Sequence, residues 1–152
     1  MKPLKFKAWD KRFNQWAYGT HPFVLNEENQ HHLNLSAFFA RIRDGRLDES
    51  TLCQFIGLED QDGKEIFEGD IYQTEFLRSH PTNRHGGSYW VKVLCVVELD
   101  KGRYVGRAIK YIPSNCEPDF SDSGLVGSIG SLDNKIKILG SIHQNPEQIT
   151  PP

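Results

Sequence analysis

Carboxylates crowd one segment of the sequence, Gly57 to Asp70 (GLEDQDGKEIFEGD). Oxygen ligands at short spacing are what a calcium loop uses. The register fails, however: if Asp60 and Asp62 held its third and fifth positions, the first would be Leu58 and the twelfth Gly69, and neither side chain is an oxygen ligand. The spacing therefore favours turn residues and solvent-facing glutamates, and it predicts neither a bound metal nor another cofactor.

Cations stand beside aromatic residues in a second segment, Arg78 to Trp90 (RSHPTNRHGGSYW). On a nucleic-acid surface, cations contact phosphates and aromatic rings stack on bases. The formal net charge of -2 lacks the basic excess of a dedicated nucleic-acid binder. The second hypothesis is therefore a small β-barrel that binds nucleic acid, with Lys92 as an additional cation. The candidate binding residues are Arg78, His80, Arg84, His85, Tyr89 and Trp90.

Residues that could act as nucleophiles lack the surroundings that activate them. The stretch Gly127-Ser128-Ile129-Gly130 does not have the GxSxG spacing of a nucleophile elbow. Cys95 falls inside an apolar strand, where a thiol is normally an inert core residue. The sequence therefore favours a protein without enzymatic activity. A hydrolase whose histidine and carboxylate meet only on folding is the third hypothesis.

The overall composition is that of an ordinary globular protein. The chain has 152 residues, of which 38% are hydrophobic and 25% charged. Its three cysteines form no CxxC pair, which argues against a disulfide framework and a thiolate zinc site. Lysines interrupt the apolar residues of Met1 to Asp10, unlike a signal peptide, and no apolar stretch is long enough to cross a bilayer. These features predict a cytoplasmic protein without membrane contact.

The elements that must position these residues are mostly strands. Apolar and polar residues alternate in Leu4 to Asp10, and a polar turn leads to a second strand near 15–18, which predicts an opening hairpin. Tyr89 to Leu99 is the strongest strand and should be central in its sheet. Asp100-Lys101-Gly102 is typical of a hairpin turn. Further strands are expected at 65–67, 71–76, 103–112 and 135–143, and a long loop at 113–134.

One short helix is expected near residues 36–45. Apolar residues recur at i, i+3, i+4 and i+7 from Leu35 to Ile42, with Ser36 as an available N-cap and Gly45 as the C′ residue. So short a helix is stable only with its apolar stripe on a sheet. The fold class is therefore mainly β, barrel-like or sandwich-like, with an SH3-like barrel as one form. We expect a single domain, 1–152, whose N-terminal part (1–50) packs on a main sheet (51–147).

Three segments resemble, in order and spacing, the start, centre and end of the YopX family of bacteriophage and prophage proteins: Lys5 to Asp10, Cys53 to Asp70 and Ile136 to Glu147. Ser141 and His143 depart from the family's usual residues. The resemblance implies a β-rich, phage-encoded, oligomerising protein without known catalytic residues. The central family motif, expected to be structural, consists of Gly57, Leu58, Asp60, Gly63, Lys64, Ile66, Phe67, Glu68, Gly69 and Asp70.

Charge alternates in blocks along the chain, with net charges of +4, -7, +4 and -3 for residues 1–25, 26–70, 71–112 and 113–152. Such blocks either make a polar surface suited to a charged partner or are interleaved by folding. With the family resemblance, they lead to the first hypothesis. The chain is a phage accessory protein that acts by binding, either to copies of itself as a homo-oligomer or to a host protein.

Overall fold

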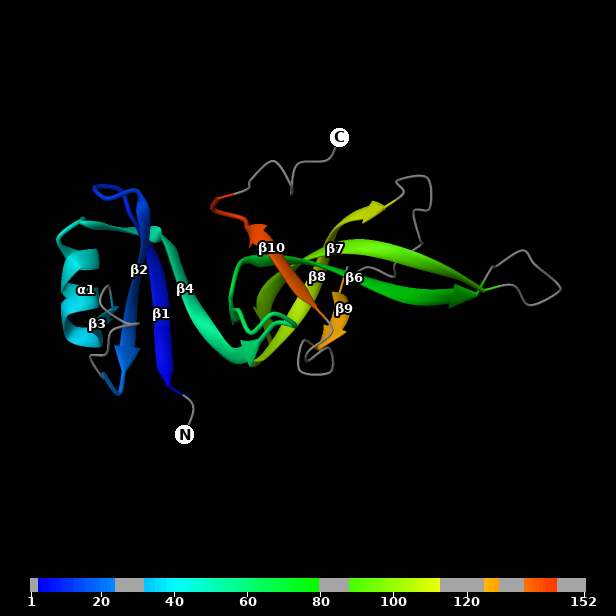
Figure 1. The fold of residues 1–152 in the computed structure, drawn as a ribbon, viewed down its shortest axis with the longest axis horizontal. Helices are drawn as coiled ribbons and strands as arrows, with labels where there is room; N and C mark the ends of the chain where they lie inside the picture. Colours follow the sequence, from blue (N-terminus) through cyan, green and yellow to red (C-terminus); the bar gives the residue numbers. More distant parts are fainter. Residues whose placement is uncertain (1–2, 24–31, 80–87, 113–124, 129–135, 145–152) are drawn as a thin grey trace. The chain divides into compact units, whose positions relative to one another are not determined.

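The computed structural model describes two compact units, Met1–Gly57 and Leu58–Pro152 (Figure 1). Its described part holds ten strands and one short helix, which confirms the mainly β prediction. The strand orders are β3-β2-β1-β4-β5 and β10-β6-β7-β8-β9, and neither closes on itself, so the described strands form open sheets and no closed barrel. The packing of residues 1–50 on a main sheet stays a prediction. The described residues are 3–23, 32–79, 88–112, 125–128 and 136–144.

The first unit opens with the predicted hairpin, β1 (Leu4–Asp10) and β2 (Gln15–His21). The strands pair antiparallel without a break, and Asp10 lies opposite Gln15 at the turn. β3 (His32–Asn34) then pairs parallel to β2; at three residues it is too short to show a period in the sequence.

Helix α1 (Leu35–Arg43) begins one residue earlier than expected. Its N-cap is Asn34, whose side-chain oxygen accepts the Ala37 N–H at 2.8 Å, so the prediction of Ser36 was wrong. The predicted C′ glycine is confirmed. Gly45 has a φ of 74°, and the N–H groups of Gly45 and Arg46 bond back into the last turn as in a Schellman motif.

The helix lies beside the β1–β2 hairpin (Figure 1) and contributes Phe38, whose side chain is fully buried, to the core of the first unit. Ala8 and Ala17 pair directly across β1 and β2 beneath it. A Cβ on Gly19 would stand 2.5 Å from the Phe38 ring, so the sheet needs glycine there to let the helix approach.

The sequence did not predict β4 (Leu47–Glu59), which pairs with β1 and runs across the boundary between the units. The register shifts between Lys7 and Trp9. At this irregularity the Thr51 hydroxyl accepts the Trp9 N–H at 2.7 Å and donates to the Asp48 carbonyl at 2.7 Å. A side chain thus replaces part of the backbone ladder, and the regular alternation that marks a strand is lost with it.

The second unit is built around β7 (Ser88–Asp100), the middle strand of its sheet as predicted. The predicted turn into the next strand is confirmed, because Lys101 and Gly102 both have positive φ, as a type I′ turn requires. A short strand at Leu125–Ser128 corrects the expectation of a loop over 113–134; the rest of that loop lies outside the described residues. The remaining strands are β5 (Glu65–Phe67), β6 (Asp70–Ser79), β8 (Arg103–Ile112), β9 (Leu125–Ser128) and β10 (Lys137–Ser141).

Candidate functional site

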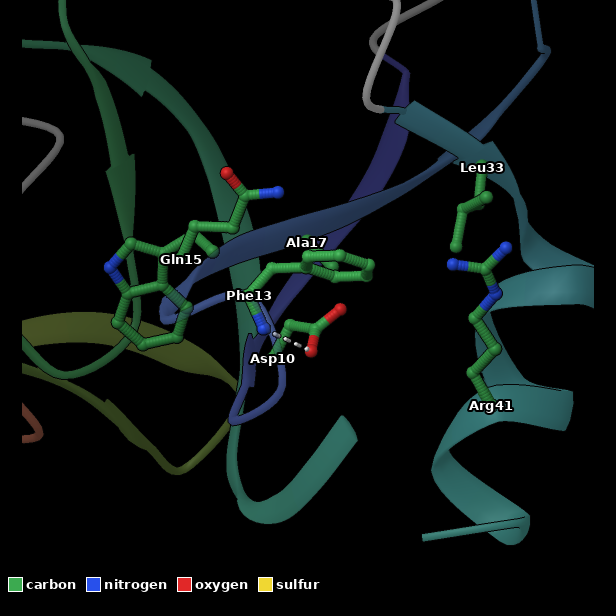
Figure 2. Close-up of a pocket in the computed structure, with 7 residues that line it drawn as sticks. Asp10, Phe13, Gln15, Ala17, Leu33 and Arg41 are labelled. Atoms are coloured by element: carbon green, nitrogen blue, oxygen red, sulfur yellow. Dashed lines mark hydrogen bonds between the residues drawn. The ribbon is translucent and has the colours of Figure 1, made fainter. Parts of the chain in front are cut away.

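A pocket of about 350 Å³ lies at the turn end of the β1–β2 hairpin, wholly within the first unit (Figure 2). The hairpin forms one wall, and β3 and α1 contribute the rest. Its lining combines apolar surface with one carboxylate, one amide and one guanidinium: Asp10, Phe13, Gln15, Trp16, Ala17, Leu33 and Arg41.

Asp10 ends β1 and shapes the turn beside the pocket. Its Oδ1 accepts the N–H groups of Arg12 at 2.9 Å and Phe13 at 3.2 Å, and the turn closes through Asn14 with a φ of 54°. The side chain is buried. Its second oxygen, Oδ2, has no hydrogen-bond partner in the described part of the chain, so one acceptor is left for another molecule.

The turn holds Phe13 at the rim of the pocket, where 61% of the residue is exposed. The guanidinium of Arg12 stands over the Phe13 ring at 5.3 Å. Figure 2 shows the ring of Phe13 beside the Asp10 carboxylate, on the hairpin side of the pocket. At the rim of the pocket the ring offers apolar surface on which a ligand could pack.

Arg41 faces the hairpin from the last turn of α1, with Leu33 beside it on the same side (Figure 2). Its guanidinium has no ion pair or hydrogen bond with any described residue. By contrast, Arg43 in the same helical turn lies 3.9 Å from Asp44, and Lys11 lies 3.4 Å from Asp48. The pocket thus holds a guanidinium and a carboxylate oxygen that are both available.

At the centre of the family motif lies Asp60, which is only 3% exposed. Its Oδ1 accepts the N–H groups of Asp62 and Lys64, both at 2.9 Å, and its Oδ2 accepts the N–H of Ile138 on β10 at 3.0 Å. Burial acts to raise the pKa of Asp60, but these three N–H groups outweigh it and hold the pKa below its ordinary value.

The remainder of the motif closes the turn between β5 and β6. Asp70, also buried, accepts the Phe67 N–H at 2.8 Å. Gly69 has a φ of 84°, donates to the Val97 carbonyl at 2.8 Å and accepts from Ile142 at 3.0 Å. The apolar residues Ile66, Phe67 and Ile71 are buried. The motif therefore joins β5, β6, β7 and β10.

The sequence-predicted binding residues fall at one end of the β6–β7 pair or beyond it. Arg78 lies directly opposite Tyr89 in the strand register, and Trp90 lies opposite Leu77. Lys92, also proposed for nucleic acid, is 3.5 Å from Glu75. Whether this group binds anything stays a prediction. His80, Arg84 and His85 lie outside the described residues.

Sequence reasoning missed the pocket residues Asp10, Phe13, Gln15 and Arg41. One signal was available: the hairpin turn KRFN carries an exposed aromatic residue where turns usually carry polar ones. Arg41 gave no signal, because a basic residue in the last turn of a helix is expected from the helix dipole alone.

The buried thiol of Cys95 belongs to the core of the second sheet. It lies beside the hydroxyl of Tyr72, which the register places directly opposite and which meets no hydrogen-bond acceptor or donor in good geometry among the described residues. Burial raises the pKa of Cys95 to about 12, although the nearby Tyr72 hydroxyl acts to lower it. The thiol therefore stays protonated at neutral pH.

Within the described ranges, no three His, Cys, Asp or Glu residues are grouped so that they could hold a metal ion. In the same part of the chain, no helix has the length and apolar character needed to cross a membrane.

The comparison with protein-family models agrees with the motif. The family model described as YopX protein matches residues 5–150. The chain is similar to the crystal structure of protein EF1440 from Enterococcus faecalis, with 20% identity, a TM-score of 0.43 and coverage of 97% of this chain and 98% of that one. No curated protein matches. Because the family model spans nearly the whole chain, this protein belongs to the YopX family.

Proposed function

We propose that this YopX-family protein is a phage accessory protein that acts in the host cytoplasm by binding a protein and not by catalysis. The partner is either a second copy of the chain or a host protein. The observation that carries the proposal is the pocket of the first unit, which is lined by the exposed Phe13 and by Arg41, whose guanidinium has no partner among the described residues.

The pocket has the composition of a contact site. Aromatic and arginine side chains supply most of the binding energy of protein interfaces, because they bury a large area and make directed hydrogen bonds. Here one of each lines the same pocket, together with the apolar side chains of Ala17 and Leu33. The described lining contains one carboxylate and no histidine, so it lends no support to the hydrolase hypothesis.

The test compares two exposed apolar side chains. The full-length chain is used as bait in the bacterial lysate and examined by light scattering, together with Phe13→Ala and the control Leu99→Ala. Leu99 is 54% exposed but lies on β7 in the second unit. We expect Phe13→Ala to lose the partner or the self-association and Leu99→Ala to keep it. A monomer that retains no protein, or equal binding by both variants, would overturn the proposal.

A nucleic-acid surface is the second candidate function. What supports it is the strand register, which sets Arg78 opposite Tyr89 on adjacent strands and hence on one face of the sheet. The prediction is salt-sensitive binding of single-stranded DNA or RNA that weakens in Arg78→Ala and Arg84→Ala. Unchanged mobility of both nucleic acids at low salt would exclude this function.

A further inference from the structure

We infer that the pocket of the first unit docks an acidic peptide segment of a protein partner. A carboxylate side chain of that segment pairs with Arg41, and a neighbouring apolar side chain packs against Phe13 and Leu33. This inference rests on the proposed binding function and adds to it the chemical class of the ligand.

Charge is the first argument. The described residues of the first unit include seven lysines and arginines and four aspartates and glutamates. Two of these carboxylates are already matched, Asp44 with Arg43 and Asp48 with Lys11, and Asp10 is held by backbone N–H groups. Of the arginines in the described part of the first unit that lack an ion pair, Arg41 is the one that lines the pocket, and its fork of N–H donors matches a carboxylate.

The remaining polar groups favour a peptide over a simple anion. Asp10 Oδ2 is an acceptor without a described partner, and a peptide can offer it a backbone N–H, which an inorganic anion or a fatty acid lacks. The Gln15 side-chain amide, also without a described partner, can donate to a carbonyl and accept from an N–H. A peptide residue with an acidic side chain supplies the N–H, the carbonyl and the carboxylate together.

Size and apolar surface agree with a short segment. A volume of about 350 Å³ is at the lower end of ligand pockets and holds one or two side chains. Phe13 at the rim gives the segment a ring to pack on as it enters and leaves.

A role for Arg41 in the helix dipole is the competing explanation, and the chain contains its own control. Arg43 lies in the same last turn of α1, so it interacts with the dipole as Arg41 does, but it does not line the pocket. Both Arg41→Gln and Arg43→Gln therefore remove a cation from the helix end, and Arg43→Gln also removes the exposed pair with Asp44, but only Arg41→Gln changes the pocket.

The experiment titrates the full-length protein with three peptides that differ in one side chain: acetyl-Leu-Glu-Phe-amide and its glutamine and lysine counterparts. Binding is followed by NMR at the backbone amides of Phe13, Gln15 and Leu33. We expect the glutamate peptide to bind about fivefold or more tightly than the glutamine peptide, which is the range of a partly exposed ion pair with hydrogen bonds. That preference should disappear in Arg41→Gln and persist in Arg43→Gln.

Each other outcome counts against the inference. Equal binding of the three peptides, or a glutamate preference that survives Arg41→Gln, would overturn the acidic ligand and leave the binding function intact. Absence of any shift with all three peptides would also overturn it. The bait experiment with Phe13→Ala then decides separately whether the pocket binds a protein by other chemistry. An unchanged amide spectrum away from the pocket shows that each variant is folded.

Discussion

Two buried aspartates, one in each unit, organise a turn by accepting hydrogen bonds from backbone N–H groups. They differ in whether a carboxylate oxygen lacks a partner among the described residues. In the second unit both oxygens of Asp60 are in use, and one of the three N–H groups comes from Ile138, 78 residues away. In the first unit only Oδ1 of Asp10 is in use, and both N–H groups come from within three residues. The second oxygen of Asp10 lacks a described partner.

The difference separates a structural carboxylate from one that is free to bind. A carboxylate with all its bonds inside the protein stabilises the fold and has nothing to offer a ligand. A carboxylate that holds its own turn with one oxygen and lines a pocket with the other can do both. By this criterion we expect the acidic family motif to be structural, and we infer that the less acidic hairpin turn is the better candidate for function.

The largest expected effect is that of Asp60→Ala. The change leaves three N–H groups without their acceptor, of which that of Ile138 is buried, and removes the side-chain link between the turn and β10, which should lower the free energy of unfolding by about 3 to 5 kcal/mol. Urea unfolding of the purified protein measures it. A loss below about 1 kcal/mol would show that water replaces the carboxylate and would end the contrast with Asp10.

Replacement of Asp10 should cost less and depend on the substitute. Asp10→Ala removes two local hydrogen bonds, as loss of a helix cap does, and should lower the free energy of unfolding by about 1 to 2 kcal/mol. Asp10→Asn keeps an acceptor at Oδ1 and should remain near wild type in stability while weakening peptide binding. Equal destabilisation by the two variants would argue that the charge, and not the turn, is what matters.

Acid should weaken the second unit through Asp60. Its pKa is lowered in the folded state, so its ionised form contributes stability above the unfolded pKa of about 4, and this is lost as pH falls through the lower folded value. Asp60→Asn cannot ionise. The stability difference between wild type and Asp60→Asn, measured in urea from pH 6 to pH 2, should therefore shrink toward acid pH. A constant difference would contradict the lowered pKa.

The smallest effect is expected two residues along the chain from Asp60. Asp62 lies 3.8 Å from Lys137, and both side chains are 59% exposed, so Asp62→Ala should change the free energy of unfolding by less than about 0.5 kcal/mol. Asp62→Ala is also the matched control for Asp60→Ala, since both remove a carboxylate from the same turn. A decrease of about 2 kcal/mol or more in the free energy of unfolding would mean that the charges of the motif stabilise the fold more than exposed ion pairs usually do.

Local rules explain which parts of the fold were predictable. Lys101-Gly102 and Gly45 were assigned correctly because left-handed backbone conformations restrict the residue types that fit. The strand around Cys95 was predicted from its many apolar residues. By contrast, β4 was not predicted, because the Thr51 side chain replaces part of its backbone hydrogen-bond ladder.

The pocket escaped sequence reasoning because no local pattern encodes it. Arg41 and Phe13 are 28 positions apart in the sequence and meet at one pocket only because α1 packs on the hairpin through Phe38 and Gly19. Whether the side chains of Asp10 and Arg41 find a hydrogen-bond or ion-pair partner within the protein likewise depends on the tertiary structure. The hairpin and the helix could be predicted from the sequence, but the pocket between them could not.

Each unit contains a buried thiol whose rate of alkylation would report how often that unit opens locally. Cys53 in the first unit is 3% exposed and Cys95 in the second is fully buried, so an alkylating reagent reaches either one only when its surroundings open. In a Cys116→Ser background, mass spectrometry of the two labelled peptides would give two opening rates from one sample. Equal rates would mean that the halves of the chain open as one cooperative body, and unequal rates would rank their local stabilities without denaturant.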